Sequence, residues 1–315
     1  MRRLISLLLM GLASALLPAD PVRAFDLPPV NLGATSFLDG APPSGPGLYF
    51  QQYLQYYTAD EFQDKDGDRA LPPFVTKNDL DVWVSLTQLV YQSDQELLWG
   101  GKWGMNVIVP YVSIDLEMTP PLLRDNGSGL GDIVVGPFLQ WDPVMGKSGP
   151  LFMHRIELQM LLPTGKYDDD KDLNPGSNFF SFNPYWAGTV FLTPKWTGSW
   201  RLHYLWNAEN NDPNDVRAVD DSQAGQAVHA NFASAYEVLP GQLRLGLNGY
   251  YLKQITASEV DGHDVSGRER VFAVGPGLLW HLSRDSHLFF NAYFETAAEN
   301  RTEGERFTLR FVHHF

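Results

Sequence analysis

The stretch Leu243-Arg244-Leu245-Gly246-Leu247-Asn248-Gly249-Tyr250-Tyr251-Leu252 alternates between two sets of side chains. One set is dominated by leucine, and the other mixes arginine, asparagine, glycine and tyrosine. Because successive side chains of a strand point to opposite faces, this period of two predicts a β-strand with one apolar and one mixed face. Residues 150–162, 199–207, 286–297 and 305–315 repeat the pattern, so the sequence predicts an all-β fold.

The alternating segments number twelve, and most are 9–15 residues long. Strands of globular proteins average about 5–6 residues, whereas a tilted strand that crosses a bilayer needs about 9–11. In hydrocarbon every backbone N–H and C=O needs an internal partner, so such strands must close on themselves. We therefore predict a transmembrane antiparallel up-and-down β-barrel of about 12 strands. The predicted strands lie near residues 48–57, 80–91, 102–116, 128–141, 150–162, 179–192, 199–207, 226–238, 243–255, 270–281, 286–297 and 305–315.

The connections between the predicted strands fall into two groups. One side carries most of the long loops and 23 Asp and Glu residues, whereas the other side carries short turns and four acidic residues. Long outer loops and short periplasmic turns are typical of outer-membrane barrels, and an even strand number puts both termini in the periplasm. A soluble β-sandwich is the alternative fold, but it has no reason to sort its loops in this way.

The two ends of the chain carry further signals. A positive start, an apolar run of about 14 residues and small residues at the cleavage positions predict a signal peptide over residues 1–24, cleaved after Ala24. Residues 25–47 are rich in Pro and Gly and are predicted to plug the lumen, with a free periplasmic tether as the alternative. Residues 48–315 form the predicted barrel. Its last strand ends in Phe315, which resembles the assembly signal that the barrel-insertion machinery reads on outer-membrane barrels.

The mixed face of each strand is assigned to the barrel interior, because a charged side chain facing lipid near the midplane costs about 2–4 kcal/mol. Acids, bases and aromatics are interleaved on this face, so internal pairing is expected. Two interpretations remain open: a narrow conduit whose aromatics hold flat apolar solutes, or an interior filled by its own side chains. The predicted lumen and solute-path residues are Tyr49, Tyr53, Tyr57, Trp83, Arg155, Glu157, Arg201, His203, Glu237, Arg244, Tyr250, Tyr293, Glu295, Arg306 and Arg310.

Several short motifs resemble the outer-membrane transporters named for the MetA-pathway (phenol meta-cleavage pathway) of phenol degradation. The resemblance spans nearly the whole chain after the signal peptide, and it implies a channel for aromatic or other hydrophobic compounds with no catalytic residues. The motifs are Val30-Asn31-Leu32-Gly33, Gly45-Pro46-Gly47-Leu48-Tyr49, Gly129-Leu130-Gly131-Asp132, Leu162-Pro163-Thr164-Gly165-Lys166-Tyr167, Asn174-Pro175-Gly176-Ser177-Asn178, Gly225-Gln226 and Gly275-Pro276-Gly277.

Other chemistry is sparse in the sequence. Without its signal peptide the chain has 20 basic and 36 acidic residues, which argues against nucleic acid as a partner. No cofactor, metal site or catalytic residue is predicted. The nearest nucleophile–base pair, Ser283 beside His281, lies at a predicted periplasmic turn, the wrong end for an enzyme that modifies outer-leaflet lipid. The acidic stretches 64–68 and 168–172 are predicted to be solvated loops, with divalent cations that bridge lipopolysaccharide as the alternative.

These features predict a non-enzymatic channel in the outer membrane of a Gram-negative bacterium, in contact with lipid and lipopolysaccharide. The predicted function is passive uptake of small hydrophobic or aromatic compounds. The alternatives are a structural or surface-binding barrel with a closed lumen and, less favoured, a lipid-modifying enzyme.

Overall fold

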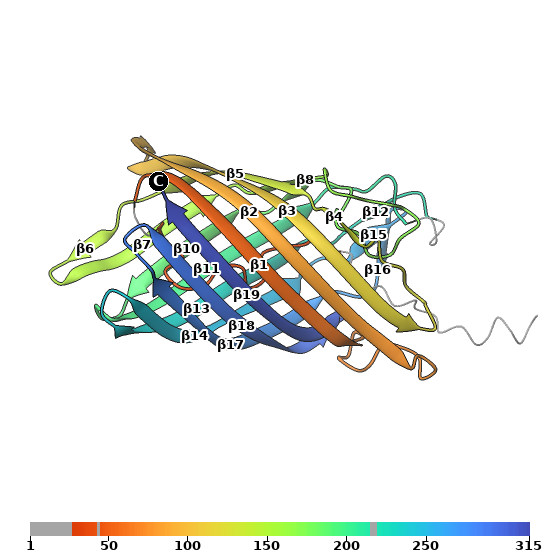
Figure 1. The fold of residues 1–315 in the computed structure, drawn as a ribbon. Coiled ribbons are helices and arrows are strands. Elements are labelled where there is room, and N and C mark those ends of the chain that lie inside the picture. The colour runs from red at the N-terminus through yellow and green to blue at the C-terminus, as the bar shows by residue number, and fades with distance from the viewer. Residues whose placement is uncertain (1–26, 43–44, 215–218) are drawn as a thin grey trace, which may run out of the picture.

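The computed structural model describes residues 27–42, 45–214 and 219–315, and their strands form a closed antiparallel barrel (Figure 1). Every strand pairs with its neighbours in the chain, and the last strand pairs with the first, from Tyr49 opposite His314 to Phe62 opposite Thr302. This closure leaves no free sheet edge, which a barrel in lipid requires. The predicted signal peptide, residues 1–24, lies outside the described residues.

The main sheet of the described chain contains sixteen strand segments, of which three pairs are single barrel strands with a short interruption and one segment extends a hairpin. Twelve barrel strands result, and each overlaps one predicted segment, so the predicted fold is confirmed. The barrel strands are β1 (Gly47–Phe62), β2 (Lys77–Leu98), β3 (Gly101–Thr119), β4 (Ser128–Leu130) continued by β5 (Ile133–Gln140), β7 (Gly149–Glu157) continued by β8 (Met160–Leu162), β9 (Ser181–Phe182) continued by β10 (Tyr185–Phe191), β11 (Trp196–Asn207), β13 (Ala227–Leu239), β14 (Leu243–Gln254), β17 (Arg270–His281), β18 (Ser286–Glu299) and β19 (Thr302–His314).

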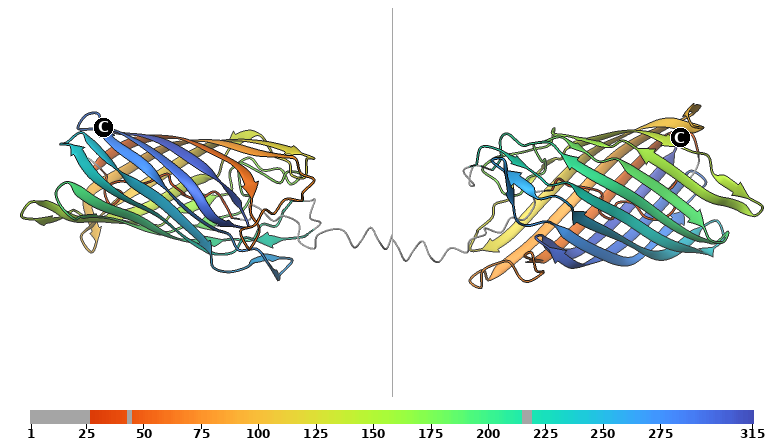
Figure 2. Two further views of the ribbon diagram at one scale, coloured as in Figure 1. Left: turned by 90° about the horizontal axis from the view of Figure 1, so that it is seen from below. Right: turned by 180° about the vertical axis from the view of Figure 1, so that it is seen from behind.

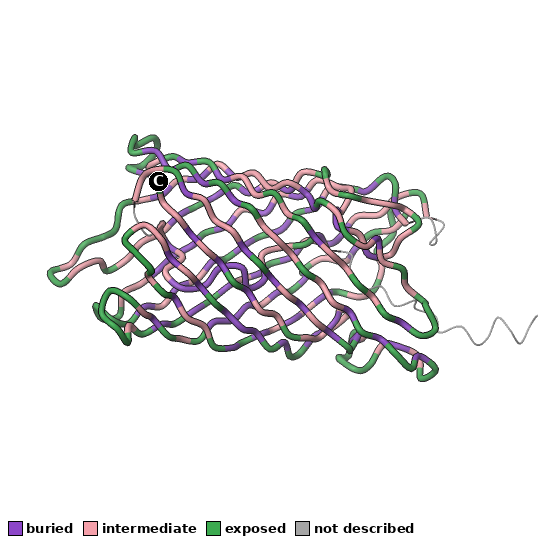
Figure 3. Tube along the Cα trace, viewed as in Figure 1, coloured by how far each residue is buried: buried purple, intermediate pink, exposed green. Residues whose placement is uncertain are grey.

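Burial alternates along the strands, as Figure 3 shows for the whole wall. In β14, Tyr250 is buried, whereas Leu245 and Leu247 are exposed on the outer face. The outer face is therefore apolar, and the inner face carries the tyrosines and charged side chains. This is the polarity expected of a barrel that sits in lipid.

The two ends of the barrel differ. Short turns and the C-terminus share one end, while the longer loops and a small sheet of β12 (Ser222–Gln223), β15 (Ser258–Val260) and β16 (His263–Val265) lie at the other (Figures 1 and 2). Phe315 follows the last strand at the turn end; its side chain is exposed, and its N–H donates to the carbonyl of Leu48 (3.0 Å).

The hairpin between β2 and β3 is longer than predicted. Residues 92–101 were expected to form a loop, but the strands continue to a two-residue turn at Trp99 and Gly100, which both have positive φ. Such a turn matches the twist of the flanking strands, so pairing extends beyond the barrel rim. A second hairpin is lengthened by β6 (Val144–Gly146), which pairs with β7. Among the described residues no helix is long and apolar enough to cross a membrane.

Candidate functional site

The barrel interior contains nearly all of the predicted lumen residues. Twelve of the fifteen are buried, at 9% relative exposure or less, and Glu237 and Arg306 are partly buried on the same inner face. The twelve buried residues are Tyr49, Tyr53, Tyr57, Arg155, Glu157, Arg201, His203, Arg244, Tyr250, Tyr293, Glu295 and Arg310. The period of two therefore placed these side chains correctly, whereas their part in a solute path stays a prediction.

Trp83 is the exception, and its predicted inward orientation was wrong. Its side chain is 55% exposed on the outer face, and its neighbours Val82 and Val84 line the interior instead. The prediction failed because it places the more polar face of residues 80–91, with Asp81, Ser85 and Thr87, toward the interior, whereas the apolar face is the inner one here.

An elongated cavity of about 420 Å³, here called the outer cavity, lies in the half of the barrel nearer the long loops. One wall is a continuous apolar surface from β2 and β3, a set of lining residues that the sequence interpretation missed. The sequence analysis predicts no lumen residue in 102–116, whose two faces are both largely apolar, and it places the wrong face of 80–91 inward. The apolar run Leu80, Val82, Val84 and Leu86 is the signal that could have identified the β2 part of this wall. The apolar wall consists of Leu80, Val82, Val84, Leu86, Ile108, Pro110, Val112 and Ile114. Other parts of the cavity are lined by polar side chains, among them Gln159, Asn183, Arg201 and Arg306.

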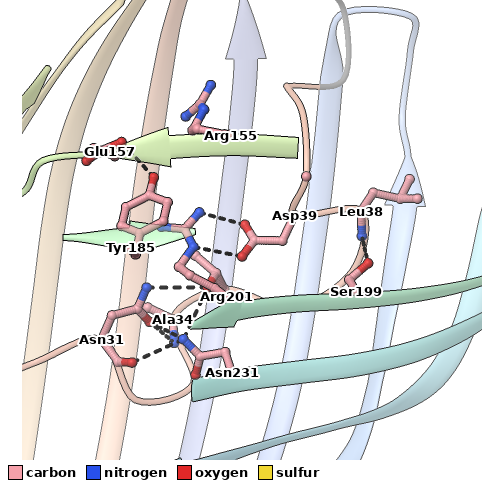
Figure 4. Close-up of polar contacts among 12 residues, drawn as sticks. Asn31, Ala34, Leu38, Asp39, Arg155, Glu157, Tyr185, Ser199, Arg201 and Asn231 are labelled. Carbon is pink, nitrogen blue, oxygen red and sulfur yellow. Dashed lines mark hydrogen bonds and ion pairs between the residues drawn. The ribbon is translucent and has the colours of Figure 1, made fainter. Parts of the chain in front are cut away.

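Residues 27–42 run through the lumen and are bonded to its wall. Arg201 of β11 holds Asp39 with two hydrogen bonds, Nε–Oδ2 2.8 Å and Nη2–Oδ1 2.7 Å, and both side chains are at most 10% exposed (Figure 4). Phe37 is 1% exposed and packs in an apolar cluster with residues from several strands. Gly40 approaches the wall so closely that a Cβ would lie 2.3 Å from the carbonyl oxygen of Met153.

Backbone groups of this lumen segment are also satisfied by the wall. The Leu38 N–H donates to Ser199 (3.1 Å) and the Gly33 N–H donates to the Asn231 side chain (2.8 Å), as Figure 4 shows in part. The Asn231 amide donates back to Asn31. Residues 27–35 border the outer cavity, and residues 37–42 border a second, inner cavity of about 80 Å³ nearer the turn end.

Buried carboxylates in the wall are satisfied by tyrosines. Glu157 accepts from Tyr185 Oη (2.6 Å) and from the Asn106 amide (2.8 Å). Glu295 accepts from Tyr57 Oη (2.8 Å) and Tyr250 Oη (2.7 Å). Such hydrogen bonds offset the cost of burying the carboxyl groups and fix the positions of the rings.

A loop at the long-loop end, residues 163–178, folds inward and is held by the Asp132 carboxylate. Its Oδ1 accepts the N–H groups of Thr164 (3.1 Å) and Gly165 (2.9 Å), and its Oδ2 accepts the N–H of Ser177 (2.8 Å). Three of the motifs quoted above thus meet at one carboxylate. As a result residues 171–177 line the mouth of the outer cavity.

Ser283 and His281 each have other partners in the described residues. Ser283 Oγ accepts the N–H groups of Asp285 and Ser286 in its turn, and His281 Nδ1 contacts His287 instead. No cluster of three or more potential ligands gathers in the described ranges. In the acidic stretch 64–68, the Asp64 carboxylate accepts the backbone N–H groups of Asp66 and Asp68, which lowers its pKa.

Comparison with known proteins places this barrel among its relatives. No curated protein sequence matches the chain. The COG4313 outer membrane channel from Pseudomonas putida F1 has a similar structure, with a TM-score of 0.76 and 18% identity over 91% of this chain and 100% of that one. The β domain of the Bordetella autotransporter BrkA gives a TM-score of 0.50 and 13% identity over 86% and 100% of the two chains. These likenesses concern the fold, which is that of an outer-membrane barrel.

A family model described as "Putative MetA-pathway of phenol degradation" matches residues 59–311, which is most of the chain. The match includes the inward-folded loop, the barrel strands from β2 to most of β19 and the apolar wall of the outer cavity. It confirms the resemblance found in the motifs, and the protein therefore belongs to the MetA-pathway of phenol degradation family.

Proposed function

We propose that the protein is an outer-membrane channel for the passive uptake of small hydrophobic or aromatic compounds. The observation that carries this proposal is the outer cavity, which has a continuous apolar wall on β2 and β3. A barrel with a purely structural interior would be filled by its own side chains and would not need such a cavity. The COG4313 relative is a channel by its description, and the family is described by phenol degradation; both agree with this function.

The expected free energy of solute binding in the outer cavity is small, which suits a channel better than a site of tight binding. An aromatic ring the size of a phenylalanine side chain removes roughly 150–250 Å² from water, worth about 4–6 kcal/mol at 25 cal/mol per Å². Association costs about 4 kcal/mol or more. The difference between these two free energies is small, so solute binding should be weak. A conducting site must release the solute that it binds.

The surroundings of the channel follow from the same proposal. The apolar outer face would contact outer-membrane lipid and lipopolysaccharide, the exposed Phe315 would be read by the insertion machinery, and the signal peptide would be cleaved after Ala24. Residues 27–42 would act as a plug that narrows the lumen between the outer and inner cavities. The barrel would have no enzymatic role.

Reconstituted protein should accelerate the entry of phenol into vesicles whose membrane contains lipopolysaccharide, which slows unaided entry. The measurement is initial uptake of labelled phenol, with protein-free vesicles as the control. If uptake stays at the protein-free rate, and also stays there after residues 25–47 are deleted, the closed structural barrel becomes the better account.

A matched pair of substitutions on β3 tests the apolar wall. Val112 lines the outer cavity, whereas Val109 is 39% exposed on the outer face. Replacing one methyl by a hydroxyl forfeits about 0.8 kcal/mol of apolar contact, so Val112→Thr should reduce phenol uptake about fourfold. Val109→Thr should leave uptake unchanged. Equal effects of the two substitutions would show that solute does not touch this wall.

A further inference from the structure

The end of the outer cavity that faces the inner cavity is polar. Tyr53 of β1 and Gln88 of β2 line both cavities, and Asn106 of β3 lines the outer one. All three side chains are at most 8% exposed. These three residues, here called the polar floor, therefore bound the outer cavity with hydrogen-bonding groups, although the same cavity has an apolar wall on β2 and β3.

Hydrogen bonds hold the polar floor in one arrangement. The Tyr53 hydroxyl donates to Gln88 Oε1 (2.8 Å), and Gln88 Nε2 donates to Asn106 Oδ1 (2.8 Å). Asn106 Nδ2 in turn donates to Glu157 Oε1 (2.8 Å), and Tyr185 Oη donates to the other oxygen of that carboxyl group (2.6 Å; Figure 4). The row joins side chains of β1, β2, β3, β7 and β10, so the floor is ordered before any solute reaches it.

A glycine allows this row to cross β5, which lies between β3 and β7 in the barrel. Gly136 of β5 is the sheet partner of Asn106. A Cβ at position 136 would overlap the Glu157 carboxyl group, so a side chain there would displace that group. Because position 136 is glycine, the Asn106 amide reaches Glu157 across the strand.

Each floor residue has hydrogen-bonding capacity beyond these bonds. The Tyr53 oxygen can still accept, and Gln88 and Asn106 each carry a second amide hydrogen. A hydrocarbon that lies against the floor removes water from these groups and gives them no partner, which is unfavourable. A hydroxyl group on the solute can both donate and accept, so it restores hydrogen bonds that the floor has lost to water.

The apolar wall begins directly beside the floor. Leu86 and Ile108 line the outer cavity and lie two residues from Gln88 and Asn106 on the same strands. Two residues of a strand span about 7 Å, which matches the length of a benzene ring with one small substituent. A ring that lies on Leu86 and Ile108 can therefore place its substituent against the floor.

We propose that the polar floor recognises the hydroxyl group of a neutral aromatic solute whose ring lies on the apolar wall. This proposal rests on the proposed channel function and narrows its substrate class from hydrophobic compounds in general to hydroxylated aromatic ones. A site built to bond a hydroxyl group discriminates against the analogue without it, because the site's own polar groups are then left unpaired. The inner cavity is not part of the site, since its volume of about 80 Å³ is well below the roughly 150 Å³ of a cavity that holds benzene.

Uptake of phenol and of fluorobenzene, which have nearly the same size, tests the proposal in vesicles that contain lipopolysaccharide and the full-length protein. The measurement is the protein-dependent part of the initial uptake rate of each labelled compound. Phenol should enter about fivefold faster, because fluorobenzene restores no hydrogen bond at the floor. Equal protein-dependent rates would overturn this proposal alone, whereas no protein-dependent uptake of either compound would reject the channel as well. This comparison needs no variant to fold.

Removing the polar groups of the floor should abolish the preference for phenol. Tyr53→Phe, Gln88→Leu and Asn106→Val are combined in one variant, in which the protein-dependent rates of phenol and fluorobenzene should come within about twofold of each other. A preference for phenol that survives in the folded variant at its full size would contradict recognition by the floor.

The matched control removes three hydrogen-bonded polar side chains from the opposite face of the same strands. Gln52 Nε2 donates to Ser85 Oγ (2.9 Å), and Thr87 Oγ1 donates to Gln52 Oε1 (3.0 Å), all on the outward face of β1 and β2. Gln52→Leu, Ser85→Ala and Thr87→Val combined should leave the preference for phenol unchanged. An equal loss of preference in this control would show that the effect does not arise at the floor.

Discussion

Replacing Asp39 with asparagine should release residues 27–42 from the barrel wall and increase solute flux by about tenfold or more. The Asp39–Arg201 pair is buried and bidentate, and removing one member of such a pair costs about 3–5 kcal/mol. A shift of 3 kcal/mol changes an equilibrium roughly a hundredfold. The population in which residues 27–42 have left the wall should therefore rise, although the bonds to Ser199 and Asn231 still favour the bound state. Flux of a small sugar into vesicles measures the opening directly.

A double variant separates release of the segment from damage to the barrel. Asp39→Asn leaves the Arg201 charge buried without its partner and should lower barrel stability. Asp39→Asn combined with Arg201→Gln removes both charges, so stability should recover while the flux stays high. Hydrogen exchange at the Leu38 amide should accelerate in both variants. If that amide stays protected and the flux is unchanged, the ion pair does not hold the segment in place.

Replacing Asp132 with alanine should open the inward-folded loop over residues 163–178. Its carboxylate accepts three backbone N–H groups and is 7% exposed. Each hydrogen bond to a charged group is worth about 1.5–3 kcal/mol, and the three act on one loop, so local opening should become easier by about 4.5–9 kcal/mol. Faster proteolysis of this loop and faster hydrogen exchange at Ser177 are the expected readouts.

Asp170, which lies in the inward-folded loop itself, provides a matched control for this prediction. It is exposed, and its side chain makes no hydrogen bond or ion pair with the described residues. Asp170→Ala removes the same charge and should leave proteolysis unchanged. The thermal unfolding of the barrel should be unaffected by either substitution, because the strands pair independently of the loop. Equal proteolysis of the two variants would contradict a specific role for Asp132.

Prediction from sequence worked best where one face of a strand was clearly polar. Tyr250 and Arg244 were placed inward because their neighbours Leu245 and Leu247 are plainly apolar, and all four lie as predicted. It failed at Trp83, because the apolar face of this strand, with Leu80, Val82 and Val84, lines the interior and the more polar face lies outside. The polar partners of the interior were also missed, since Asp39 and Arg201 are 162 positions apart and only the closed barrel brings them together.

By itself the sequence determined that twelve strands close in an antiparallel ring, because a period of two repeats in most segments and strands in hydrocarbon can satisfy their backbone groups only by closing on themselves. The tertiary structure alone decided what fills that ring. The buried Asp39–Arg201 pair and the three hydrogen bonds to Asp132 join distant segments, and the apolar wall of β2 and β3 faces the lumen only because the barrel closes. The energies of these contacts depend on which side chains lie opposite each other in the lumen. The local pattern of the sequence does not determine which side chains those are.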